Sequence, residues 1–94
     1  MASERKMVNK YQQTAEMEID LHGYTSEESR DILDILFREK KYKHVRIITG
    51  RGNNSVNGPV LPNFVRRYLA AHGARYNTAK LSDGGEGALE VFLK

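Results

Sequence analysis

Two stretches with the pattern of β-strands flank one stretch with the periodicity of an α-helix, and this order constrains the fold more than any other feature. In residues 17–21, the apolar Met17, Ile19 and Leu21 alternate with polar side chains, as in a half-buried strand. Residues 45–49, Val-Arg-Ile-Ile-Thr, predict a second strand. Because a helix lies between them, we expect a β-α-β unit with parallel strands and a right-handed crossover.

The segment between these strands begins with a helix-start signal. Thr25 and Glu28 have the spacing of a capping box, in which each side chain accepts a hydrogen bond from the other residue's amide. We expect the helix to end near Lys40-Lys41, whose positive charges suit a helix C-terminus. One stripe of apolar side chains would face the core: Ile32, Leu33, Leu36 and Phe37.

The second half of the chain predicts one helix followed by two strands. Residues 50–58 form a loop rich in glycine and asparagine, and Pro59 fits the first turn of a helix that stops at Gly73. Residues 74–80 and 88–93 predict two strands that pair as an antiparallel hairpin through the glycine-rich turn between them. The apolar stripe of the helix is Val60, Leu61, Phe64, Val65, Tyr68 and Leu69.

These elements predict an α/β (α+β) fold, a two-layer sandwich in the order β-α-β-α-β-β with a mixed four-stranded sheet. Residues 17–94 would form this domain, and residues 1–16 a flexible N-terminal arm. The 94 residues of the whole chain are enough for one modest hydrophobic core. The absence of cysteine excludes disulfides, thiolate zinc sites and a cysteine nucleophile. No apolar run approaches a membrane span and the polar N-terminus has no signal-peptide core, so we expect a soluble cytoplasmic protein.

The charges of this chain are segregated, so the net charge of +3 understates them. Between Glu16 and Glu39 there are eight acidic residues and two basic ones. Between Lys43 and Ser82 there is no acidic residue, although the block carries seven cations: Lys43, Arg46, Arg51, Arg66, Arg67, Arg75 and Lys80. Such a block suggests a polyanionic partner, although a solvated basic surface is equally compatible with it.

Asp20 and His22 stand at the end of the first predicted strand. Two residues of pleat put both side chains on one face, so a carboxylate lies beside an imidazole. The carboxylate can fix the tautomer of the imidazole and stabilise its protonated form, which makes the pair a candidate general base. The spacing alone is a weak pattern and also fits a strand end with two solvated polar groups.

Thr49-Gly50-Arg51-Gly52 stands at the end of the second predicted strand. Ligands of open α/β sheets collect at the carboxyl ends of parallel strands, so we expect this segment beside Asp20 and His22. Gly50 and Gly52 would expose backbone amides, the N-termini of both helices would point to the same side, and Arg51 would offer a guanidinium to phosphate oxygens. The Gly-Lys-Ser/Thr ending of a Walker P-loop is absent, and a glycine-rich loop alone also fits a simple connector.

Three motifs in this order resemble those of the Smr (small MutS-related) domain family. They are Asp20-Leu21-His22-Gly23, Thr49-Gly50-Arg51-Gly52 and Gly84-Gly85-Glu86-Gly87-Ala88, and the resemblance spans roughly residues 17–94. It implies nucleic-acid binding and, in many members, endonuclease activity on RNA or DNA, in settings such as ribosome rescue or recombination. It assigns Asp20 and His22 to cleavage and Gly50 and Gly52 to the substrate loop. Many members have histidine where this chain has Thr49.

We therefore expect an endonuclease that favours RNA over DNA, with His22 as general base and Asp20 assisting it. Gly50, Arg51 and Gly52 would hold the phosphate, with Thr49 in the same segment. The alternative is a non-catalytic nucleic-acid-binding module. Metal dependence and oligomeric state stay open, although Asp20 would be the carboxylate for a divalent metal. The nucleic-acid backbone that flanks the reacting phosphate would be held by three arginines, Arg66, Arg67 and Arg75.

Overall fold

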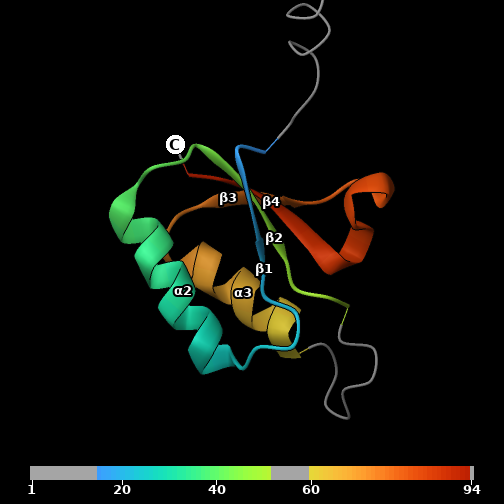
Figure 1. Cartoon of the computed structure of the whole chain (residues 1–94), viewed down its shortest axis with the longest axis horizontal. Helices are drawn as coiled ribbons and strands as arrows, with labels where there is room; N and C mark the ends of the chain where they lie inside the picture. Colours follow the sequence, from blue (N-terminus) through green and yellow to red (C-terminus); the bar gives the residue numbers. More distant parts are fainter. Residues whose placement is uncertain (1–14, 52–59, 94) are drawn as a thin grey trace, which may run out of the picture.

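The computed structural model describes residues 15–51 and 60–93, which form a four-stranded sheet and two long helices (Figure 1). The first strand, β1 (Met17–Asp20), leads into helix α2 (Ser26–Glu39). Strand β2 (His44–Ile48) follows, and then helix α3 (Val60–Ala71). The chain ends with β3 (Arg75–Thr78), two 3₁₀ turns, η1 (Leu81–Asp83) and η2 (Gly85–Gly87), and β4 (Ala88–Phe92). The predicted β-α-β-α-β-β order is confirmed.

The sheet is mixed, as expected, with the strand order β1-β2-β4-β3. Strands β1 and β2 run parallel, with Asp20 opposite Ile48. Strand β4 is antiparallel to both β2 and β3. The carboxyl ends of β1 and β2 therefore lie at the same edge of the sheet.

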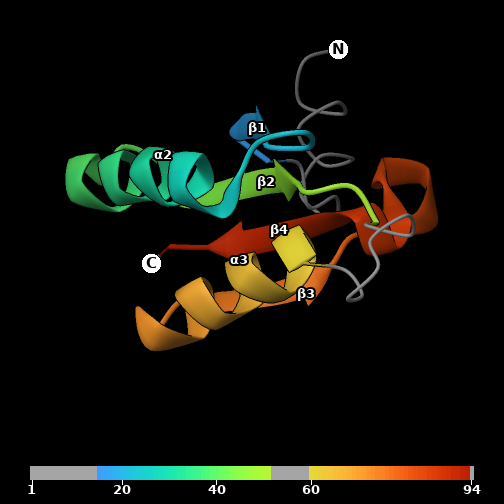
Figure 2. The same cartoon turned by 90° about the horizontal axis from the view of Figure 1, so that it is seen from below.

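Both helices cover one face of the sheet, which gives the predicted two-layer sandwich (Figures 1 and 2). The core between the layers takes Leu33 and Leu36 from α2 and Val65 and Leu69 from α3. It takes Val45, Ile47, Leu89 and Val91 from the two central strands. The period-two pattern of these strands turns alternate apolar side chains toward the helices, and their burial provides the main stabilisation.

Helix α2 begins with the predicted capping box. The Thr25 amide donates to Glu28 Oε1 at 2.9 Å, and the Glu28 amide donates to Thr25 Oγ1 at 3.0 Å. The helix ends at Glu39, and Lys40 adopts the left-handed conformation with φ 54°. Pro59, the predicted start of the second helix, lies outside the described residues. Val60 was expected in the apolar stripe of α3, but it is 49% exposed.

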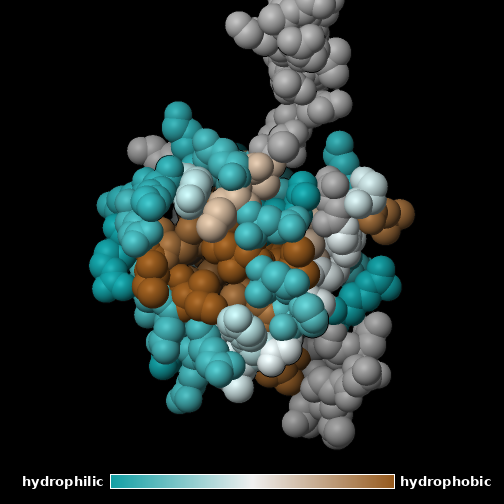
Figure 3. All heavy atoms as spheres, in the orientation of Figure 1, coloured by the Kyte–Doolittle hydropathy of each residue, from teal (hydrophilic) through white to brown (hydrophobic). Residues whose placement is uncertain are grey.

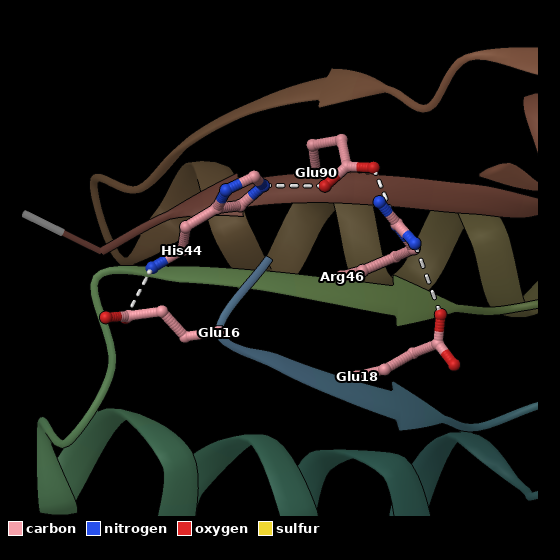
Figure 4. Close-up of polar contacts among 5 residues, drawn as sticks. All are labelled: Glu16, Glu18, His44, Arg46 and Glu90. Carbon is pink, nitrogen blue, oxygen red and sulfur yellow. Dashed lines mark hydrogen bonds and ion pairs between the residues drawn. The ribbon is translucent and has the colours of Figure 1, made fainter. Parts of the chain in front are cut away.

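The face of the sheet opposite the helices carries a polar network instead of a second apolar layer (Figure 4). His44 Nε2 lies 2.6 Å from Glu90 Oε1, and Arg46 Nε donates to Glu90 Oε2 at 2.7 Å. Arg46 also reaches Glu18, at 3.4 Å. His44 and Glu90 are both almost fully buried. Arg46, one cation of the basic block, is thus paired within the domain.

The start of the ordered domain lies before β1. The Glu16 carboxylate accepts a hydrogen bond from the Lys43 amide at 2.6 Å and one from the His44 amide at 3.3 Å. These bonds lower the pKa of Glu16. Glu16 was expected to belong to a flexible arm, but these bonds tie it to the start of β2. The rest of that predicted arm, residues 1–14, lies outside the described residues.

The surface of the helical side is not uniformly polar. Figure 3 shows apolar side chains gathered over α2 and beside β1, with hydrophilic side chains around them. Ile35 of α2 is 46% exposed and Met17 of β1 is 39% exposed. Among the helices of the described ranges, none has the length and apolar character needed to cross a membrane.

Candidate nucleic-acid and catalytic site

Asp20 and His22 form a direct side-chain pair at the end of β1. His22 Nδ1 lies 2.6 Å from Asp20 Oδ1, and the His22 amide donates to the same oxygen at 3.0 Å. The intervening Leu21 is fully buried and anchors the segment in the core. The two polar side chains are 52% and 69% exposed, for Asp20 and His22 respectively, so a ligand in solvent can reach them. The predicted carboxylate–imidazole pair is present.

The pKa of Asp20 is lowered, first by the hydrogen bond from the His22 side chain and then by the one from the His22 amide. An ionised carboxylate can only accept hydrogen bonds, so neutral His22 must carry its hydrogen on Nδ1 in this geometry. The lone pair of Nε2 is then free to accept a proton. The pair has the arrangement of a general base with its orienting carboxylate.

Gly50 lies against this pair, as the parallel arrangement of β1 and β2 predicts. The Leu21 amide donates to the Ile48 carbonyl at 2.7 Å, which joins the two strand ends. A Cβ atom added to Gly50 would lie 3.4 Å from His22 Cβ, and Gly50 has a φ of +73°. Gly52, the other glycine predicted for this loop, lies outside the described residues.

The amide of Gly50 is not free. It donates to the Gly87 carbonyl at 3.0 Å, and the Thr49 amide donates to the same oxygen at 2.9 Å. The Thr49 side chain is buried, and its hydroxyl donates to the Gly50 carbonyl at 2.8 Å. The expectation that Gly50 exposes a phosphate-binding amide is therefore wrong, because the turn before β4 already occupies that donor. Thr49 supports the loop from inside.

The Gly84–Gly87 turn lies beside the same site, although its sequence pattern predicted only a turn between two strands. A Cβ atom on Gly87 would lie 3.4 Å from the Gly50 carbonyl carbon, and one on Gly85 would lie 3.8 Å from Arg51 Nη2. Arg51 therefore lies along this turn. The signal for this contact in the sequence was the close glycine spacing, because a backbone that packs against another backbone has no room for side chains.

The start of α2 offers less to an anion than expected. Figure 1 shows the starts of α2 and α3 at the same end of the sheet as the ends of β1 and β2. However, the Glu28 carboxylate already lies at the start of α2 and accepts from the Thr25 amide. This fixed negative charge occupies the position where a phosphate would benefit from the helix dipole.

The predicted arginines separate into two groups. Arg51 and Arg67 are exposed and Arg66 is partly exposed. Among the side chains that the structure describes, no ion pair involves any of these three arginines. Arg75 lies at the other end of the sheet. In the strand register, Arg75 lies opposite Phe92 of β4, and Phe92 lies opposite His44 at the start of β2. Arg75, which was expected to contact flanking nucleic-acid backbone together with Arg66 and Arg67, therefore begins β3 at the edge opposite the glycine loop, because β3 runs parallel to β2.

The donors present at the site do not make a divalent metal site by themselves. Within the parts of the chain that the structure describes, no group of three or more His, Asp and Glu side chains could hold a metal ion. Asp20 and His22 supply one carboxylate and one imidazole, and each is already bonded to the other.

Comparisons with known proteins agree with the fold of this chain. The model of the Smr domain family matches residues 19–94. An uncharacterised protein of Treponema pallidum (strain Nichols) is 40% identical over 85 residues, which cover 84% of this chain and 42% of that protein. The chain thus spans less than half the length of that relative.

Solved structures of Smr proteins resemble this fold. The Smr domain of Thermus thermophilus MutS2 matches with a TM-score of 0.70 at 24% identity, covering 83% of this chain and 98% of that one. YdaL, a stand-alone small MutS-related protein from Escherichia coli, matches with a TM-score of 0.66 at 25% identity. That match covers 82% of this chain and 63% of YdaL.

Proposed function

This chain belongs to the Smr domain family, whose domains are nucleases or nucleic-acid-binding domains, and from that premise we propose that it is an endonuclease that favours RNA over DNA. The observation that carries the proposal is the 2.6 Å contact between His22 Nδ1 and Asp20 Oδ1 at an exposed strand end. It leaves Nε2 as a proton acceptor that faces no competing partner among the described residues.

RNA supplies its own nucleophile to such a base. His22 Nε2 would take the proton of a 2′-hydroxyl, and the 2′-oxygen would attack the adjacent phosphorus. The bond from phosphorus to the 5′-oxygen breaks, and that oxygen takes a proton from water. The products are a 2′,3′-cyclic phosphate and a 5′-hydroxyl. DNA lacks the 2′-hydroxyl, so the same pair would have to activate water, which is the physical basis for favouring RNA.

Arg51 is the best-placed residue to hold the reacting phosphate. It directly follows Gly50, which contacts His22, and its side chain lies along the Gly84–Gly87 turn. A guanidinium can bind two phosphate oxygens at once and can offset the charge that develops on them. The exposed Arg67 and the partly exposed Arg66 would then contact backbone phosphates away from the reacting one.

Cleavage assays with matched substrates test this function. Single-stranded RNA should be cut to fragments ending in 2′,3′-cyclic phosphate, and an RNA with one 2′-deoxynucleotide should resist cleavage at that position. Parallel reactions with a chelator decide metal dependence, which the proposed chemistry does not require. Cleavage of DNA and of the 2′-deoxy position at the rate of RNA would contradict the proposed mechanism.

A non-catalytic nucleic-acid-binding module is the second candidate. It is favoured by the presence of a single imidazole at this edge of the sheet, because His44 and His72 lie at the other end. No second histidine is therefore placed to protonate the leaving oxygen. A parent protein that binds RNA and DNA but cuts neither, with and without divalent metal, would establish this candidate.

A further inference from the structure

Tyr24 lies on the turn that carries the proposed general base. Its amide donates to the Leu21 carbonyl at 3.0 Å, which closes a four-residue turn with His22 in the second position. Gly23, in the third position, has a φ of +86°, close to the roughly +80° of that position in a type II turn. Figure 1 shows this turn within the cyan loop between β1 and α2. The turn thus fixes the backbone of Tyr24 relative to the residue that bears the imidazole.

The turn is anchored on both sides of His22 and Tyr24. The fully buried Leu21 holds its first residue in the core, and the capping box of Thr25 and Glu28 holds the chain directly after it. Two residues of chain span at most roughly 7 Å, so the Cα atoms of His22 and Tyr24 are no farther apart than that. A nucleotide whose 2′-hydroxyl meets His22 Nε2 therefore lies, itself or through its neighbour in the strand, within reach of the Tyr24 ring.

The Tyr24 side chain is available to a ligand. It is 48% exposed. Within residues 15–51 and 60–93, its ring is paired with no other aromatic ring and no cation, and its hydroxyl makes no hydrogen bond. Other aromatic side chains of these ranges pack against the core or stack on a neighbouring ring: Phe37, Tyr42, Phe64, Tyr76 and Phe92.

The usual structural role of an apolar residue at this position does not apply to Tyr24. Tyr24 directly precedes Thr25, the N-cap of α2. An apolar residue before the N-cap often packs against the fourth residue of the helix, in a hydrophobic staple. The fourth residue of α2 is Ser29, a fully buried hydroxyl side chain that offers no apolar surface of the size a tyrosine ring needs. The start of the helix therefore does not explain an aromatic residue here.

We propose that Tyr24 stacks on a base of the bound nucleic acid, and that the candidate site therefore takes an unpaired nucleotide. The inference rests on the proposed function, because that nucleotide is the one at His22 or its neighbour in the strand. Every nucleobase has a flat face that can stack on an aromatic ring, so the contact tolerates different sequences. Sequence-specific or not, an aromatic side chain reaches a base only when the base is unstacked. The substrate class is thus a single strand, a loop or a bulge.

Binding of a single-stranded RNA of twelve nucleotides tests this contact. The measurements are made in the His22→Ala protein so that cleavage does not interfere. Adding Tyr24→Ala should weaken binding about fivefold or more, because removal of a stacking ring has at least this effect, whereas Tyr24→Phe keeps the ring and should stay within about twofold. Ile35→Ala is the matched control, since it removes a side chain of similar exposure, 46%, from the second half of α2. It should leave the affinity unchanged.

Two further ligands separate base stacking from a disturbance of the turn. An abasic strand of the same length keeps the sugars and phosphates but has no bases, and an RNA duplex of twelve base pairs keeps its bases stacked on one another. Tyr24→Ala should not change the affinity for either ligand. A loss on the abasic strand as large as the loss on RNA would overturn the proposal, because it would show that the substitution acts through the turn and not through a base.

The outcome is distinguishable from the fate of the endonuclease proposal, because binding is measured without cleavage. Equal affinity of the His22→Ala protein and the His22→Ala/Tyr24→Ala protein for the single strand would overturn the stacking role, even if the parent cuts RNA. A fivefold loss that is confined to the single strand would support stacking, even if the parent cuts nothing. A His22→Ala protein that binds no single-stranded RNA would also overturn the proposal.

Discussion

Gly50 lies so close to His22 that a Cβ atom added to Gly50 would be 3.4 Å from His22 Cβ. This contact joins the glycine loop after β2 to the imidazole after β1, and it requires a backbone φ of +73°. Only glycine meets both conditions without strain. The position of the proposed base therefore depends on a residue 28 positions from it in the sequence.

The first prediction follows from this contact. Gly50→Ala should lower the free energy of unfolding by about 1–2 kcal/mol, the usual cost of a left-handed conformation for a residue with a Cβ. It should also reduce cleavage, because the new methyl group contacts the residue that bears the imidazole. Gly23→Ala is the matched comparison for stability, since Gly23 has φ +86° with nothing within 4 Å of its added Cβ. Urea titration and RNA cleavage measure the two effects, and a Gly50→Ala protein with parental activity would contradict the contact's importance.

The second prediction concerns the catalytic pair. His22→Ala should lower the cleavage rate by roughly 10²–10⁴-fold, the usual contribution of a general base. Because the His22 side chain is 69% exposed, stability should change by no more than about 0.5 kcal/mol. Asp20→Asn should lose activity too, since an amide cannot stabilise the protonated ring. Asp31→Asn, an exposed carboxylate on α2, is the control. A His22→Ala protein that cleaves RNA at the parental rate would contradict the assignment of His22 as the general base.

The third prediction concerns three cations of the basic block, Arg51, Arg66 and Arg67. We expect Arg66 and Arg67 to contact phosphates. In the Arg66→Ala/Arg67→Ala protein, the slope of log affinity against log salt concentration should then be smaller in magnitude by about 1.4, because each contact contributes about 0.7 on single-stranded RNA. Arg51→Ala should reduce cleavage more than binding, because Arg51 is the residue beside the reacting phosphate. Affinity measured from low to moderate salt tests both expectations, with Arg30→Ala as the matched loss of one positive charge. An unchanged slope in the double variant would exclude both residues as phosphate contacts.

The fourth prediction concerns the polar network on the open face of the sheet. Arg46→Met should destabilise the domain by about 2–3 kcal/mol, because it leaves the buried Glu90 carboxylate with one partner fewer. Removing both charges in Arg46→Met/Glu90→Leu should cost less than the sum of the two single changes. Urea unfolding of the four proteins in this cycle measures the coupling. Additive losses would show that the ion pair does not contribute to stability.

The fifth prediction concerns acid stability. The folded-state pKa values of Glu16 and Asp20 are lowered from 4.5 and 3.8, the ordinary values, by their hydrogen bonds. Groups of this kind stabilise the folded state fully above their unfolded pKa, and that contribution is lost as the pH falls through the folded pKa. Stability should therefore decline below about pH 4.5, and Glu16→Gln should make the decline shallower. Urea unfolding at several pH values between 3 and 6 checks this, and parallel curves for variant and parent would contradict it.

The sequence by itself determined the elements and their order, because these depend on local patterns. The alternation around Ile19, the Thr25–Glu28 capping box and the apolar stripe of α2 each act over a few neighbouring residues. The Asp20–His22 pair was also predictable, since strand parity alone puts two residues at this spacing on one face.

Only the tertiary structure decided which of the other candidate residues share a site. Strand β4 lies between β2 and β3, so β3 runs parallel to β2 and Arg75 begins it at the far edge. The Gly50 amide is satisfied by Gly87, and the Arg46 charge by Glu90, which are both distant in the sequence. A local pattern does not specify such partners, because strand order and hydrogen-bond pairing are set by how whole elements pack together.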